Sequence, residues 1–237
     1  SVVTSANVAC GGHAGDRESM TRVAELATAR RVAIGAHVSY NDRAGFGRES
    51  NGVSMEVLKE QLIEQIATLD EIAQASGSAV TYVKAHGQLY HQACVPGSVE
   101  AQTIIDAVRD YRRQTDRQLA ILGFAGSDLI KRAQDEHLKT ANEAFADRSY
   151  TPEGWLVART EPGALITDPT EALVRLKRLL RDREIVAIDG TPIDVRADSI
   201  CIHGDTPGAV VLARRVRAAI DSDRVKIAPF APPPRAA

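Results

Sequence analysis

Short apolar runs rich in β-branched residues alternate with longer segments of helical periodicity through most of this 237-residue chain. The pattern predicts strands over residues 2–9, 32–36, 80–85, 119–122, 138–143 and 199–202. It predicts helices over residues 16–30, 54–77, 99–114, 127–136, 168–181 and 206–221. Because crossovers of helical length join parallel neighbours, the alternation predicts an α/β protein with a mostly parallel sheet.

The last third of the chain is less regular. Residues 150–163 hold two prolines and two glycines and predict a long ordered loop, and residues 184–195 predict a hairpin around Asp189-Gly190. The proline-rich tail, residues 229–237, is expected to be extended or frayed. Since 44% of the residues are apolar, which is enough for one sizeable core, we expect a single domain over residues 1–228 followed by the tail.

Four of the six histidines stand where a predicted strand runs into a loop. The segments SANVACGGHAGD, VAIGAH, VTYVKAHG and SICIHGD lead to His13, His37, His86 and His203. In a barrel of parallel strands the carboxyl ends all point to one mouth, whereas an open sheet gathers its chemistry near one switch point. Strand-end polar residues here come from five strands, so we favour a barrel, irregular or incomplete, with one shared site at its mouth.

Composition excludes several classes of function. The formal net charge is −2 and the isoelectric point is about 6.3, with no block of like charges, so neither a nucleic acid nor an anionic membrane is an expected partner. No apolar run approaches the ~18 residues that span a bilayer. Three widely spaced cysteines without a C-x-x-C pair indicate a reduced, cytoplasmic protein. The expected partner is a small-molecule substrate.

Six sequence blocks resemble the LamB/YcsF family. They are, in chain order, SANVACGGHAGD, IGAHVSYNDRAGFGR, VKAHGQLYH, EAFADRSYTPEGWLVAR, PGALITD and ICIHGDTPGAV, and they extend from Ser5 to about Val210. The resemblance implies an irregular (β/α) barrel of the glycoside hydrolase/deacetylase type, seven-stranded in the family and lacking the first strand here. It also implies the role of the A subunit of an ATP-dependent 5-oxoprolinase, which opens 5-oxo-L-proline (pyroglutamate) to L-glutamate with partner subunits B and C. ATP, with Mg²⁺, is then used by the complex.

The reaction suggests roles for the strand-end residues. Hydrolysis of an activated lactam needs a base for water, hydrogen-bond donors for developing negative charge, and cations that hold a carboxylate or phosphate. The expected catalytic residues are His13, His86, His203, Asp147 and Asp205. The expected substrate-binding residues are Asn7, Asp16, His37, Lys84 and Arg148. Asp147 and Arg148 have an alternative interpretation as a local salt bridge that holds the 150–163 loop.

Two other functions remain open on the sequence. His13, His37, His86 and His203 with a nearby aspartate would form a divalent metal set, which would make the chain a metal-dependent, ATP-independent hydrolase of a cyclic amide or carbohydrate-type substrate. No H-x-x-x-H or H-E-x-x-H spacing supports this set. The chain would otherwise be a non-catalytic subunit that binds a small carboxylic acid. The P-loop pattern G-x-x-x-x-G-K-[ST] is absent, which favours ATP handling by a partner, and formation of a homo-oligomer is left open.

Overall fold

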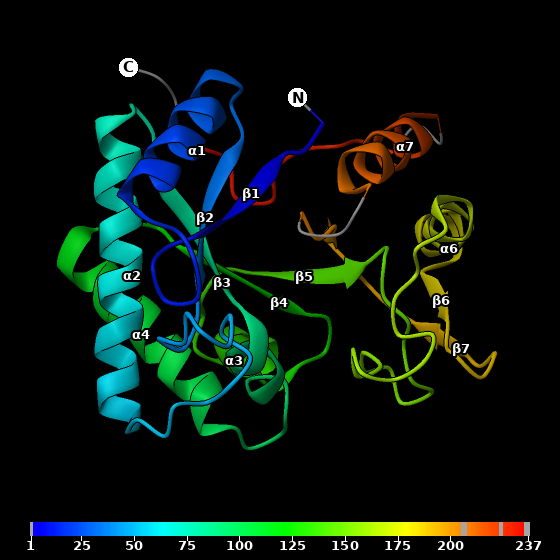
Figure 1. Ribbon diagram of the computed structural model, residues 1–237, viewed down its shortest axis with the longest axis horizontal. Coiled ribbons are helices and arrows are strands. Elements are labelled where there is room, and N and C mark those ends of the chain that lie inside the picture. The colour runs from blue at the N-terminus through cyan, green and yellow to red at the C-terminus, as the bar shows by residue number, and fades with distance from the viewer. Residues whose placement is uncertain (1, 205–207, 223–224, 235–237) are drawn as a thin grey trace. The chain divides into compact units, whose positions relative to one another are not determined.

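Six strands form one sheet in the computed structural model, which describes residues 2–204, 208–222 and 225–234 (Figure 1). The strand order is β1-β2-β3-β4-β5-β8. The pairs β1–β2, β2–β3, β3–β4 and β5–β8 are parallel, which confirms the α/β prediction. The strands are β1 (Ser5–Ala9), β2 (Ala33–Val38), β3 (Val80–Ala85), β4 (Ala120–Phe124), β5 (Thr140–Phe145) and β8 (Ser199–Cys201).

The helices follow the strands in the predicted alternation. They are α1 (Arg17–Ala29), α2 (Met55–Ala75), α3 (Gly87–Gln92), α4 (Val99–Thr115), α5 (Asp128–Asp135), α6 (Pro169–Asp182) and α7 (Ala209–Ser222). The predicted N-caps Asp16 and Ser54 are confirmed, and Asp168 rather than Thr170 caps α6. The predicted hairpin is confirmed as the antiparallel pair β6 (Glu184–Val186) and β7 (Pro192–Asp194).

Helix α3 is the one described helix that the sequence pattern does not predict. It has six residues, too few to show helical periodicity, and it begins directly after His86 at the end of β3. The expected division into one domain over residues 1–228 and a tail stays a prediction. The described chain forms two compact units, one of residues 3–141 and 229–234, the other of residues 142–204, 208–222 and 225–228.

The core of the first unit consists of the strands and the apolar face of α2. Every residue of β3 and β4 is buried, as expected for strands of a parallel sheet that is covered on both faces. The ring of Tyr82 lies over Gly35 in β2. A Cβ at this position would lie 2.1 Å from the ring, so only glycine fits there. The Phe230 ring contacts Tyr82 edge-on at 4.8 Å, so the start of the proline-rich tail packs on β3.

The core of the second unit lies around α6 and α7, with Ile200 of β8 packed against it. Its buried residues are Ala146, Ile166, Ala172, Leu176, Leu212, Val216 and Ala219. Among the described residues of both units, no helix combines the length and the apolar character that crossing a membrane requires.

Asp70 on α2 is a fully buried carboxylate that joins three elements of the first unit. It accepts hydrogen bonds from the backbone N–H of Val80 at 2.9 Å, the hydroxyl of Tyr111 at 2.9 Å and Nε of Arg117 at 3.0 Å. These donors belong to β3, to α4 and to the segment after α4, and a fourth, Nε2 of Gln74 on α2 itself, lies at 3.0 Å. Because a buried charge without partners is costly, Asp70 and its donors stabilise the packing only as a set.

We predict that Asp70→Ala lowers the free energy of unfolding by about 3 kcal/mol, because four donors lose their acceptor. Urea denaturation followed by circular dichroism measures the loss.

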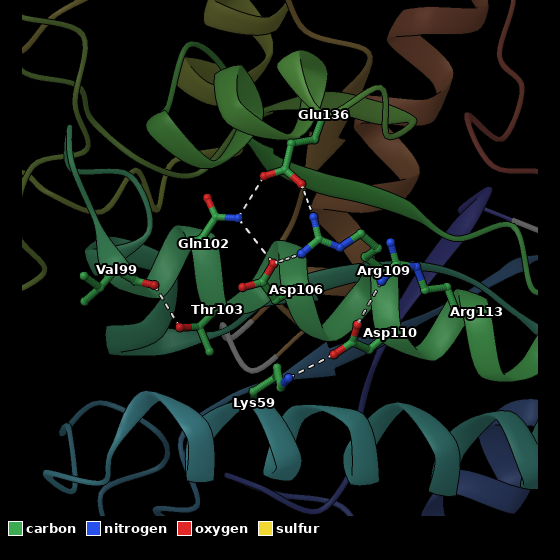
Figure 2. Close-up of polar contacts among 9 residues, drawn as sticks. All are labelled: Lys59, Val99, Gln102, Thr103, Asp106, Arg109, Asp110, Arg113 and Glu136. Atoms are coloured by element: carbon green, nitrogen blue, oxygen red, sulfur yellow. Dashed lines mark hydrogen bonds and ion pairs between the residues drawn. The ribbon is translucent and has the colours of Figure 1, made fainter.

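The matched control lies in the surface network that joins α2, α4 and α5 (Figure 2). There Arg109 pairs with Asp106 and Glu136, and Lys59 pairs with Asp110, all with partly exposed side chains. Since exposed ion pairs contribute little, Asp106→Ala is expected to cost less than about 1 kcal/mol. Equal costs for the two variants would contradict the role given to Asp70.

Candidate active site

Three of the predicted histidines meet in the first unit. The rings of His13 and His86 stack with centroids 3.7 Å apart and an interplanar angle of 10°. His37 lies edge-on to both rings, at 5.5 Å from His13 and 4.8 Å from His86. The three side chains come from the turn after β1, from β2 and from the end of β3, so the predicted gathering at strand ends is observed for these histidines.

The loop between β2 and α2 lies against this histidine cluster. Phe46 packs edge-on against His13 and His86, with ring centroids 5.3 Å away in each case. Gly47 has φ +70°, and a Cβ there would lie 2.9 Å from Cβ of His13 and 3.0 Å from Cδ2 of His86. Nη1 of Arg43 donates to the carbonyl oxygens of Gly11 and Gly15 at 3.1 and 2.9 Å. The loop is thus attached to the turn that carries His13.

Hydrogen bonds determine the protonation of the His37–His86 pair. Nδ1 of His37 faces the carbonyl oxygen of Lys84 at 3.2 Å, and Nε2 of His86 faces the carbonyl oxygen of Phe46 at 2.9 Å. Carbonyl oxygens only accept, so both nitrogens must carry hydrogen. Nδ1 of His86 lies 3.1 Å from Nε2 of His37, so the two remaining ring nitrogens face each other.

His37 is the neutral member of the pair. Burial lowers the pKa of His37 well below its usual value of 6.5, and the positive charge of Lys84 lowers it further. Its hydrogen is on Nδ1, and its lone pair is on Nε2, which faces His86.

Two further predicted substrate-binding residues lie on β3 and β1 of the same unit, with β2 between these strands. Lys84 is buried beside His37 in the β2–β3 register, and its Nζ lies 5.6 Å above the ring of Tyr90. Oδ1 of Asn7 accepts a hydrogen bond from the hydroxyl of Tyr82 at 2.8 Å. This bond orients the Asn7 amide, whose nitrogen is the end with hydrogen to donate.

The second unit holds the other predicted pair. Nδ1 of His203 lies 2.9 Å from Oδ2 of Asp147, and the same oxygen accepts the backbone N–H of His203 at 3.3 Å. Burial raises the pKa of Asp147, but the hydrogen bond and charge of His203 outweigh burial, so the net pKa is lowered and the carboxylate is ionised. The ring of His203 also stacks on Phe145, with centroids 5.6 Å apart.

Two other predicted site residues, Asp16 and Arg148, bond to backbone groups. Asp16 is exposed and accepts the backbone N–H of Ser19 at 2.8 Å as the N-cap of α1. Arg148 is buried, and its Nη2 donates to the carbonyl oxygen of Val157 at 2.6 Å, so it holds the 150–163 loop through the backbone. Their contact with a substrate stays a prediction. Asp205 lies outside the described residues.

Within the described part of the chain, no group of three or more His, Cys, Asp or Glu side chains is arranged to hold a metal ion. Metal binding by His13, His37, His86 and His203 stays an untested prediction.

Several residues around the cluster are not predicted from the sequence, among them Ser39, Gln65 and Tyr82. Two of them carry a readable signal. Ser39 follows His37 by two residues and therefore points to the same side of an extended segment. Gln65 lies in the apolar stripe of α2 that contains Leu58, Leu62 and Leu69, where a polar residue needs a partner.

Comparison with known proteins identifies the family. Residues 1–234 match the LamB/YcsF family. The chain belongs to this family. It is 49% identical over 98% of its length to the 5-oxoprolinase A subunit of Streptomyces avermitilis, of which the match covers 90%. It is 47% identical over 97% of its length to the 5-oxoprolinase A subunit of Paracidovorax citrulli, with 90% of that protein covered.

A solved structure supports the same assignment. The lactam utilization protein from Thermus thermophilus superposes with a TM-score of 0.87 at 36% identity. The match covers 96% of this chain and 89% of that protein. The fold of this LamB/YcsF member is thus shared with a lactam utilization protein over nearly the whole chain.

We predict that His13 makes stability depend on pH. Burial, followed by the positive charges of His86 and Arg43, lowers the pKa of His13 from 6.5 to about 3. The unfolded chain therefore binds a proton that the folded chain does not, and stability is lost as the pH falls from about 6.5 towards 3. Between pH 7.5 and 5.5 this group is expected to cost about 1.4 kcal/mol, which urea denaturation at both pH values measures.

His13→Gln should remove that part of the pH dependence. His91→Gln is the control, because His91 is exposed and its replacement leaves the dependence unchanged. If His13→Gln and the unaltered protein lose equal stability between the two pH values, His13 is not held neutral.

Proposed function

We propose that this chain is the A subunit of an ATP-dependent 5-oxoprolinase, which hydrolyses 5-oxo-L-proline to L-glutamate together with partner subunits B and C. The observation that carries the proposal is the 47–49% identity, over nearly the whole chain, to proteins named as this 5-oxoprolinase component. The likeness to a lactam utilization protein supports the substrate class, because 5-oxoproline is a five-membered lactam. We further propose that the six parallel strands belong to an irregular (β/α) barrel of the glycoside hydrolase/deacetylase type.

ATP activates the amide in this proposal. Phosphorylation of the lactam carbonyl oxygen, with Mg²⁺ bound to the ATP phosphates, makes the carbonyl carbon of the ring more electrophilic. We assign this step to the partner subunits, because the chain has no P-loop pattern. Water then attacks the ring carbon, the C–N bond breaks as nitrogen takes up a proton, and a second water releases phosphate to leave glutamate.

The Asp147–His203 pair is the proposed base for the attacking water. Because Asp147 accepts from Nδ1 of His203, the lone pair of the neutral ring stands on Nε2, where it can take a proton. The ionised carboxylate stabilises the imidazolium that forms, and this imidazolium then supplies the proton that the leaving nitrogen needs.

The first unit supplies the proposed electrostatic and binding groups. The proposal gives His86 a proton in the working complex, and this positive charge would stabilise negative charge that develops on the substrate. His13 stays neutral, so its unprotonated nitrogen is suited to accept the lactam N–H rather than to act as the base. Asn7 and Lys84 are the proposed donors to the carboxylate and phosphate oxygens. Arg148 stays a proposed substrate-binding residue.

The proposal is tested by reconstituting the chain with subunits B and C, ATP, Mg²⁺ and 5-oxo-L-proline, and by measuring glutamate and phosphate. Glutamate that forms only with ATP and all three subunits supports the proposal. Glutamate formed without ATP but abolished by a chelator would favour the metal-dependent hydrolase. An active complex that does not need this chain for turnover would favour a binding subunit.

In the same assay His203→Asn and Asp147→Asn are predicted to lower kcat by about 10²- to 10⁴-fold, because each removes part of the general base. His91→Asn, an exposed histidine outside the proposed machinery, serves as the control and should retain full turnover. Unchanged kcat in His203→Asn would rule out His203 as the base.

Location and assembly complete the proposal. We propose a cytoplasmic protein, since its three cysteines are free thiols and a reducing compartment keeps them so. Co-purification of a tagged chain with subunits B and C tests the proposed complex.

A further inference from the structure

Gln65 is a polar residue on the buried face of α2, with a relative exposure of 5%. Its Oε1 accepts the backbone N–H of Ser39 at 3.0 Å, and its Nε2 donates to the backbone carbonyl oxygen of Ser39 at 2.9 Å. Nε2 also lies 3.3 Å from Oδ1 of Asn41. One side-chain amide thus satisfies both backbone groups of Ser39, as a neighbouring strand would, and holds the chain just beyond the end of β2.

The side chain of Ser39 points from this fixed backbone to the histidine cluster. Its hydroxyl donates to the carbonyl oxygen of Tyr40 at 2.9 Å and lies 3.0 Å from Nδ1 of His13. A hydroxyl has one hydrogen, which here goes to Tyr40, so the oxygen must accept from His13. Nδ1 of His13 therefore carries the hydrogen of the neutral ring, and the lone pair is on Nε2.

We propose that Ser39 and Gln65 are positioning residues that hold His13 in its Nδ1–H tautomer, so that Nε2 faces the substrate as a hydrogen-bond acceptor. The role of His13 in this inference rests on the proposed function.

Gly12 supports the proposal independently. A Cβ at this position would lie 2.5 Å from Oγ of Ser39 and 2.7 Å from Oε1 of Gln65. The turn that carries His13 therefore packs its backbone directly on the positioning pair, with no room for a side chain between them. The orientation of His13 is controlled from both sides, by its own backbone and by the hydroxyl of Ser39.

The first test reads the tautomer without any activity. The full chain is labelled with ¹⁵N-histidine, and long-range ¹H–¹⁵N spectra report which ring nitrogen of His13 carries hydrogen; the signals are assigned by their loss in His13→Gln. We expect the Nδ1–H form in the unaltered chain and in Ser39→Thr, which keeps a hydroxyl. We expect a mixture of both tautomers in Ser39→Ala and in Gln65→Met, an apolar side chain of similar length.

Ser127→Ala is the matched control for a general loss of stability. Ser127 is fully buried and caps α5, and it lies outside the contacts given above for the cluster. Its replacement should leave the tautomer of His13 unchanged. A tautomer that is also unchanged in Ser39→Ala, or mixed in the unaltered chain, would overturn the inference.

The second test uses the reconstituted complex. Ser39→Ala and Gln65→Met are expected to lower turnover by about 10- to 100-fold, with recovery in Ser39→Thr, because a displaced hydrogen-bonding group acts on the reaction through geometry. Normal turnover in Ser39→Ala would overturn the inference. An inactive unaltered complex would instead contradict the proposed function, while the tautomer measurement would still decide the positioning.

Discussion

The parallel pairing of β2 with β3 is the constraint on which the histidine cluster depends. Their register sets His37 opposite Lys84, and the ladder continues as the backbone N–H of His86 donates to the carbonyl oxygen of Val38 at 2.8 Å. This register brings Nδ1 of His37 to the carbonyl oxygen of Lys84 and leaves its Nε2 for His86. A shift of one residue would turn these side chains to the opposite face of the sheet.

Burial gives each imidazole of the cluster a defined set of hydrogen-bond partners. In water a histidine exchanges freely between tautomers and charge states near neutral pH, but a buried ring must satisfy its hydrogen bonds with the groups around it. Two backbone carbonyl oxygens and one serine hydroxyl decide where the hydrogens of the cluster reside. His13 and His37 are therefore neutral rings with hydrogen on Nδ1, whereas Nε2 of His86 carries hydrogen.

The hydrogen bonds between Ser39 and Gln65 cannot be predicted from the local sequence pattern. The two side chains are 26 residues apart, and their hydrogen bonds exist only because α2 packs over the end of β2. Likewise, folding brings Asp147 to His203, 56 residues away, and Arg148 to the carbonyl oxygen of Val157. Such partners are decided by packing between distant segments.

By itself the sequence determined the α/β alternation, most helix and strand positions and the strand-end histidines. These features depend on side-chain periodicity and on caps such as Asp16 and Ser54, whereas the six residues of α3 carry no period. The tertiary structure alone decided the stacking of His13 on His86, the contact between His37 and His86 and the tautomer of His13. Those properties depend on which hydrogen-bonding groups from distant segments meet in a buried space, and only the packed fold brings these groups together.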